Sequence, residues 1–134
     1  MVFLYLACNS ASEVLSHRAV RSALTYAIER DKIVAEHYRG FAYAAVLPAS
    51  PKSPWYHKGL AQKYGYAPEK LTQAVTQAGV AGIPVTLLVN TDDSVRLRVA
   101  RKIAQALNQC GLKVTTAELN GADYREALAK GEFD

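Results

Sequence analysis

A strand, a helix and a second strand in succession over residues 83–119 constrain the fold of this chain more than any other feature of its sequence. Residues 83–89 are almost continuously apolar, which is typical of a strand buried on both faces. After a polar turn at 90–94, apolar residues recur at helical spacing until Gly111, a residue type suited to ending a helix. Residues 112–119 then alternate as a strand does. This order predicts two parallel neighbouring strands joined by a right-handed crossover.

Residues 18–39 predict two consecutive helices. Ser16 is a suitable N-cap for the first helix and Asp31 for the second, because both side chains can accept hydrogen bonds from free amides. Gly40 is expected to end the second helix in a left-handed conformation. The first helix carries an apolar stripe at three- and four-residue spacing, formed by Val20, Ala23, Leu24, Ala27 and Ile28. We expect this stripe to face the core.

The rest of the chain predicts one more strand, three more helices, one of them a short helix through 58–63, and a long connection. Residues 2–8 are rich in β-branched and aromatic residues and run into a polar loop, as a strand does. Three prolines within seven residues make 41–54 an extended surface connection. One helix is expected to begin at Pro68 and end at Gly79, and a last helix to cover 122–130.

Together these elements predict a single α/β domain over 1–134, with a small mixed sheet flanked by helices. Its strands are expected near 2–8, 83–90 and 112–119. A chain of 134 residues can bury one hydrophobic core, and 50% hydrophobic with 21% charged residues is typical of globular proteins. The longest apolar run, around 80–90, is too short to span a bilayer.

Charge and cysteine content exclude several classes of partner. The net charge is +4, but the basic residues are spread over helix faces, so the sequence does not predict a nucleic-acid-binding surface. Cys8 and Cys110 are consistent with two separate buried thiols, or with one disulfide in an oxidising compartment. No spacing of Cys and His residues predicts a metal site, and no cofactor is expected.

Catalytic motifs are absent from the sequence. His17, His37 and His57 have no recognisable Ser or Cys partner, and surface or helix-end positions explain them. The adjacent Asp92 and Asp93 are explained by the attraction of acidic side chains to a helix N-terminus. The phosphate-binding and nucleophile motifs of common enzyme families do not occur. We therefore expect that the protein is not an enzyme.

Five segments in order resemble a known family. The matching residues are Tyr5-Leu6-Ala7-Cys8-Asn9; Val20-Arg21 with Tyr26-Ala27-Ile28-Glu29-Arg30; Pro68-Glu69-Lys70 to Ala78-Gly79; Val85 to Asn90; and Gly131-Glu132-Phe133-Asp134. They resemble the second lobe of the family 5 extracellular solute-binding proteins, which are the oligopeptide, dipeptide and nickel receptors of ABC transporters. The family's usual Pro-Phe-x-Asp is replaced by Val14-Leu15-Ser16-His17, so the usual capping Asp is missing.

The resemblance implies a periplasmic-binding-protein-like lobe and a transport function. It implies that residues 1–134 form part of lobe II of a two-lobed receptor, without the first lobe and the closing segment. Such a receptor captures a peptide-like solute in the periplasm or outside the cell by hinge closure, and delivers it to a membrane permease. The alternative is a ligand-sensing domain of a cytoplasmic transcription regulator with the same fold.

Within such a lobe, a few polar and aromatic residues are candidates for ligand contact. The resemblance points to Asn9 at a strand end, to the turn from Asn90 to Ser94, and to Arg96, which could hold a ligand carboxylate. Several tyrosines and a tryptophan lie in expected loops, where they either line a ligand cleft or cover the sheet edge; Tyr43 is the candidate among them.

Overall fold

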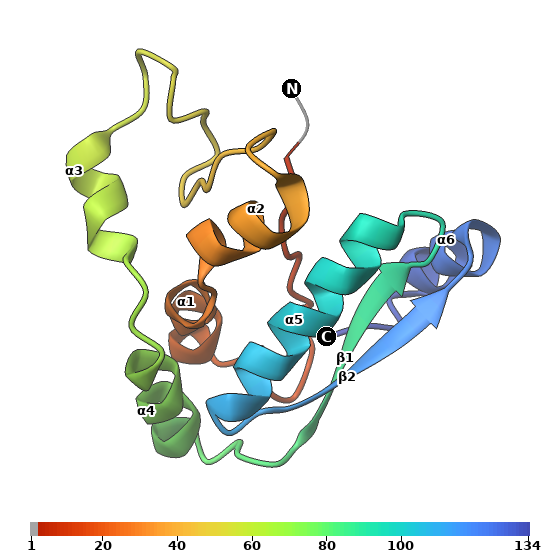
Figure 1. The fold of residues 1–134 in the computed structure, drawn as a ribbon. Helices are drawn as coiled ribbons and strands as arrows, with labels where there is room; N and C mark the ends of the chain where they lie inside the picture. Colours follow the sequence, from red (N-terminus) through yellow and green to blue (C-terminus); the bar gives the residue numbers. More distant parts are fainter. Residues whose placement is uncertain (1–2) are drawn as a thin grey trace.

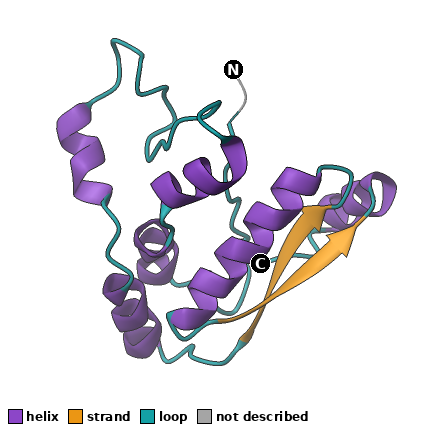
Figure 2. Cartoon of the chain, viewed as in Figure 1, coloured by secondary structure: helices purple, strands orange, loops and turns teal. Residues whose placement is uncertain are grey.

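A two-stranded parallel sheet crossed by one long helix forms the centre of the protein in a computed structural model, which describes residues 3–134 (Figures 1 and 2). Strand β1 spans Pro84–Asn90 and strand β2 spans Lys113–Leu119, paired in register from Pro84 with Lys113 to Asn90 with Leu119. Helix α5, Ser94–Gln109, connects the strands and contacts both of them. The predicted parallel strand–helix–strand unit is therefore confirmed.

Side chains at both ends of α5 fix it to its neighbours. Asp93 caps its N-terminus by accepting hydrogen bonds from the amides of Val95 (3.0 Å) and Arg96 (2.9 Å). Near its C-terminus, the Asn108 side chain accepts a bond from the Val114 amide (2.6 Å) and donates one to the Val114 carbonyl (3.0 Å). Asn108 thus pairs with the outer edge of β2 as a residue of a neighbouring strand would.

The two predicted helices of residues 18–39 are present, with different caps. Helix α1 spans Arg18–Ala27 and α2 spans Arg30–Tyr38. His17 occupies the cap position of α1, while the Ser16 hydroxyl donates to the Glu13 carbonyl instead. Asp31 lies inside the first turn of α2 and does not cap it. The Ser16 and Asp31 cap predictions are wrong because the helix boundaries shift by one or two residues.

The turn between α1 and α2 is held by Arg30. Its guanidinium donates to the Thr25 carbonyl (2.8 Å), one of the carbonyls that the end of α1 leaves free, and to the Thr25 hydroxyl (2.6 Å). Partial burial lowers the pKa of Arg30, an effect that nearby Asp31 opposes. The Tyr-Ala-Ile-Glu-Arg segment is therefore a structural joint.

The hydrophobic core lies where α1, α4 (Glu69–Ala78) and α5 meet, with α1 packed on α4 (Figure 1). The apolar stripe of α1 faces it, as expected. The largest side chains that are completely buried are Leu71, Val14, Val20 and Val75.

Two shorter helices and a last helix complete the fold. The connection after α2 leads to α3 (Lys58–Ala61), which continues into the 3-10 helix η1 (Gln62–Tyr64); these elements extend away from the sheet (Figure 1). Helix α6, Gly121–Lys130, begins directly after β2 and contacts both strands.

The α/β fold class is confirmed, but the strand predicted near 2–8 is not formed within residues 3–8; its first position, residue 2, lies outside the described residues. Among the described residues, the sheet is parallel and not mixed. The physical reason is the edge of β1: Asp134 occupies it, donating its amide to the Thr86 carbonyl (3.1 Å) and accepting the Thr86 amide on its side chain (2.6 Å). Residues 3–8 therefore have no ladder partner there, and Phe3, Leu4 and Tyr5 remain exposed.

The two cysteines are separate free thiols. Cys110 is buried, as expected, whereas Cys8 is exposed, so the prediction of a second buried thiol is wrong. No disulfide joins them.

Candidate functional site

The carboxyl ends of β1 and β2 meet at one edge of the sheet, where open α/β sheets bind ligands. The two turns that follow the strands are joined there: the Thr91 amide and hydroxyl both donate to the Leu119 carbonyl, at 2.8 and 3.2 Å. This pairing holds the N-terminus of α5 beside that of α6. We call this region the carboxyl edge, formed by residues 90–96 and 119–125.

Three of the predicted ligand residues lie together at the carboxyl edge. The Asn90 side chain accepts the Asp92 amide (2.9 Å), which shapes the turn, and Ser94 is the exposed first residue of α5. The Arg96 guanidinium lies 3.8 Å from the Asp93 carboxylate and is 44% exposed. The loose ion pair leaves most of the guanidinium free to bind another carboxylate.

Asp92 has a different environment from the one predicted. It does not cap α5; its carboxylate lies against the backbone of Gly121, so that a Cβ atom at position 121 would overlap it. Arg125 approaches the same point, with Nη1 3.3 Å from the position of that missing Cβ. Asp92 belongs to the predicted turn, whereas Gly121 and Arg125 are residues of the carboxyl edge that the sequence analysis missed. The Asn120-Gly121 pair at the start of α6 was the feature of the sequence that could have indicated a close approach of another group to the backbone there.

The Asn120 side chain completes the edge by capping α6. It accepts from the amides of Ala122 (3.0 Å) and Asp123 (3.2 Å), and it donates to the Asp123 carboxylate (2.6 Å). The carboxyl edge thus carries both acidic and basic side chains, which can bind a polar solute through both its donors and its acceptors.

Asn9 does not join the carboxyl edge. Its side chain donates to the Phe133 carbonyl (3.0 Å) and accepts the Ala11 amide (3.0 Å), and its own amide donates to the Asp134 carbonyl (3.1 Å). Asp134 pairs with Thr86, which precedes Asn90 by four residues, or about 13 Å along a strand. Asn9 therefore joins the N-terminal segment to residues 133–134, beside the middle of β1.

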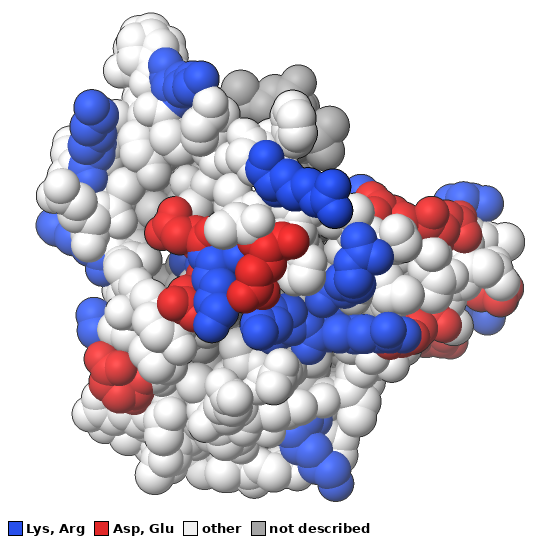
Figure 3. Space-filling model, in the orientation of Figure 1, with Lys and Arg blue, Asp and Glu red and all other residues white. Residues whose placement is uncertain are grey.

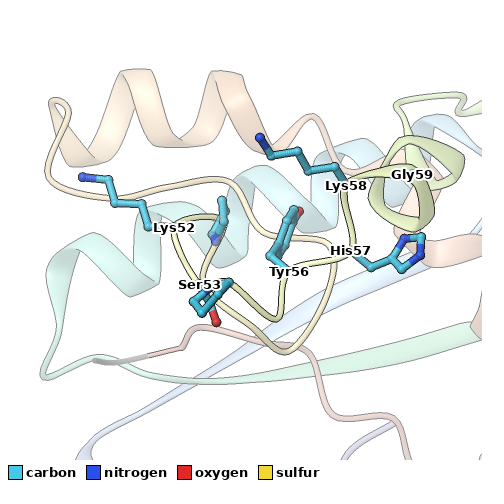
Figure 4. A pocket seen from close by; sticks show the side chains of 8 residues that line it. Lys52, Ser53, Tyr56, His57, Lys58 and Gly59 are labelled. Atoms are coloured by element: carbon cyan, nitrogen blue, oxygen red, sulfur yellow. The ribbon is translucent and has the colours of Figure 1, made fainter.

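Tyr43 lies on a second surface, in the connection between α2 and α3. Its ring is exposed, and the Lys52 ammonium lies 4.7 Å from the ring centroid. Beside it is an open recess of about 620 Å³, shown in Figure 4. No hydrogen bond or ring contact among residues 3–134 links Tyr43 to the carboxyl edge.

The part of the chain that the structure describes holds neither a metal-binding cluster nor a membrane-spanning helix. Residues 3–134 contain no cluster of three or more His, Cys, Asp or Glu side chains placed to hold a metal ion. Within the same range, no helix has both the length and the apolar character needed to cross a membrane.

Comparison with known proteins gives a family match over the whole chain. The profile of the bacterial extracellular solute-binding proteins, family 5 middle region, matches residues 1–134. Among curated proteins, the oligopeptide-binding protein AppA of Bacillus subtilis is 30% identical over 146 aligned residues, covering 98% of this chain and 27% of AppA. Heme-binding protein A of Haemophilus influenzae is 27% identical, covering 96% of this chain and 24% of that protein.

Solved structures share the fold. The structure of AppA from Bacillus subtilis with a nonapeptide superposes with a TM-score of 0.73 at 28% identity, covering 90% of this chain and 27% of AppA. The periplasmic binding protein AgaA from Agrobacterium, in complex with agropinic acid, has a TM-score of 0.82 at 24% identity, covering 94% of this chain and 26% of AgaA. The chain spans about a quarter of the length of the relatives that it matches.

Proposed function

Because the chain belongs to family 5 of the bacterial extracellular solute-binding proteins, a family of binding proteins and not of enzymes, we propose that it forms part of the second lobe of an ABC importer's receptor. The observation that carries this proposal is the match of the family profile to every residue of the chain, supported by the fold shared with AppA. In this role the intact receptor captures a peptide-like solute outside the cytoplasm.

The carboxyl edge is the surface that we assign to the solute. Asn90 and Ser94 offer hydrogen-bonding groups suited to peptide amides, and Arg96 offers a charge suited to a carboxylate. These residues lie on a turn and a helix end held by Asp93 and Thr91, so they are positioned before a ligand arrives.

Binding of this kind needs a second surface. Closure of another lobe over the carboxyl edge adds contacts that exist only in the closed state, and their free energy shifts the population toward that state. The closed receptor then delivers its solute to the permease. Tyr43 is proposed as a further contact at the margin of the cleft.

The test uses the intact protein that contains this chain. Mass spectrometry of ligands that copurify with it, followed by calorimetry with a pool of short peptides, is expected to identify a peptide. Changing Arg96→Gln should weaken binding of peptides with a free carboxylate by about threefold to tenfold, as expected for one partly exposed charged contact.

Arg98→Gln is the matched control, because Arg98 is exposed on the same helix and takes part in no ion pair among residues 3–134. The Arg98→Gln variant should bind peptides with a free carboxylate as tightly as the wild-type protein does. Absence of any bound solute in the intact protein would overturn the proposal. Recovery of the protein in the cytoplasmic fraction would favour the ligand-sensing domain of a regulator instead.

A further inference from the structure

The net positive charge of the chain comes entirely from one stretch. Residues 37–68 contain four Lys and Arg residues and no Asp or Glu. The other twelve Lys and Arg residues balance the twelve Asp and Glu residues of the chain. This acid-free stretch covers the connection after α2, helix α3 and η1, and Figure 3 shows basic side chains without acidic ones over the uppermost part of that face.

The recess beside Tyr43 lies within the acid-free stretch. Its labelled lining residues in Figure 4 are Lys52, Ser53, Tyr56, His57, Lys58 and Gly59. In Figure 4, Lys52 lies at the left, Lys58 at the upper right, and the Tyr56 ring below Lys58. The recess is open to solvent, so a ligand can enter without displacing any part of the protein.

Local hydrogen bonds shape the backbone around the recess. The Ser53 amide donates to the Ser50 carbonyl (2.8 Å), and the Tyr56 amide donates to the Ser53 carbonyl (3.0 Å). The His57 imidazole accepts the Leu60 amide (2.9 Å) and so joins the recess to α3. Two prolines, Pro51 and Pro54, further restrict this backbone. The walls are therefore formed without a ligand, which reduces the entropy cost of binding.

The two lysines of the recess have no carboxylate partner among residues 3–134. Among residues 3–134, the contact of His37 with Glu36 is the one ion pair that involves a residue of the acid-free stretch. All the other ion pairs join residues outside it. The Lys52 ammonium instead lies over the Tyr43 ring, which leaves its other hydrogen-bonding positions open. Both ammonium groups are thus available to an anion.

We propose that this recess binds the oxyanion group, a carboxylate or a phosphate, of an anionic solute. As an assignment of substrate class, this inference rests on the proposed role in solute capture. Lys52 and Lys58 supply positive charge at the rim of the recess, and the Tyr56 hydroxyl can donate a hydrogen bond to the oxyanion. The absence of acidic side chains from the whole stretch favours anions over neutral or cationic solutes.

The test is an NMR titration of the 134-residue chain with succinate, with inorganic phosphate and with neutral succinamide, in separate experiments. Either anion should shift the amide resonances of Ser53, His57 and Lys58, and succinamide should not. Response to succinate alone or to phosphate alone identifies which oxyanion the recess prefers, and response to both supports the shared chemistry.

The double variant Lys52→Gln/Lys58→Gln should weaken anion binding by about fivefold or more, given the strength of exposed charge contacts. Lys113→Gln removes one positive charge from the exposed start of β2, and should change binding by less than about twofold because it lies outside the recess. A circular dichroism spectrum establishes that each variant is folded. Absence of shifts with both anions, or equal loss in the double variant and in Lys113→Gln, would overturn the inference.

A parallel measurement on the intact protein separates this inference from the proposed function. If the intact protein binds a neutral solute and the two lysine changes have no effect, the recess assignment fails while solute capture stands. If the intact protein binds no solute but the recess still responds to anions, the proposed function fails and the anion site stands.

Discussion

The Asn108 side chain provides the sharpest test of how the sheet is stabilised. It makes two hydrogen bonds to the backbone of Val114, at 2.6 and 3.0 Å, and the Asn108→Ala change removes both. Each such bond contributes about 1 kcal/mol to the free energy of unfolding. Alanine returns about 0.6 kcal/mol through its higher helix propensity, because Asn108 lies inside α5. The expected net loss is about 1.4 kcal/mol.

Water reduces this loss, because Asn108 is exposed and solvent can reach the freed edge of β2. We therefore expect a loss of about 1 kcal/mol, measured as a lower midpoint with an unchanged slope in urea unfolding. Asn108→Asp keeps the acceptor for the Val114 amide but places a carboxylate oxygen against the Val114 carbonyl. It should destabilise the protein at least as much as alanine does.

Gln109→Ala is the control, since Gln109 is exposed on the same helix and its side chain makes no hydrogen bond among the described residues. It should be neutral or slightly stabilising. If Asn108→Ala is as stable as Gln109→Ala, the Asn108 pairing contributes nothing and the reasoning is refuted.

Three other predictions concern pH, the core and the thiols. Hydrogen bonding from Arg101 lowers the pKa of Glu118 from 4.5 to about 2. The ionised Glu118 side chain therefore stabilises the protein above pH 4.5, and this stabilisation is lost as the pH falls toward 2. Between pH 4.5 and 2, the melting temperature of Glu118→Gln should fall less than that of the wild-type protein. Leu71→Ala should cost about 2 to 5 kcal/mol in urea unfolding, because Leu71 is completely buried, and a loss below 1 kcal/mol would contradict the packing. Iodoacetamide should modify exposed Cys8 well before buried Cys110, as peptide mass spectrometry would show. Desolvation by neighbouring groups raises the pKa of both thiols, although the Cys8 residue as a whole is exposed, so alkaline pH is required.

The central strands and α5 could be predicted from the sequence because their pattern is local. A continuous apolar run, a capped amphipathic helix and an alternating segment each need only neighbouring residues to be recognised. The segment 2–8 has an equally suitable composition, yet residues 3–8 form no strand. Composition cannot supply a partner strand, and Asp134 takes the available position on β1.

The candidate site was also predictable only where its residues are close together in the sequence. Asn90, Ser94 and Arg96 lie within seven residues of each other, so their proximity follows from the chain itself. Asn9 was grouped with them through the resemblance and Tyr43 as an aromatic residue in an expected loop, and the structure places both on other surfaces. The approach of Asp92 to Gly121 depends on how α6 packs against the turn after β1, which no local pattern encodes.

The bonds between Asn9 and residues 133–134 have a consequence for the order of folding. The Asn9 side chain and the Phe133 carbonyl are separated by 124 residues in sequence. Closing a flexible loop of that length costs roughly 4 kcal/mol of chain entropy, several times what one hydrogen bond returns. These bonds can therefore form only after the core of α1, α4 and α5 has already brought the two segments together. We expect this corner to be the last part of the molecule to close during folding and among the first to open by local fluctuation.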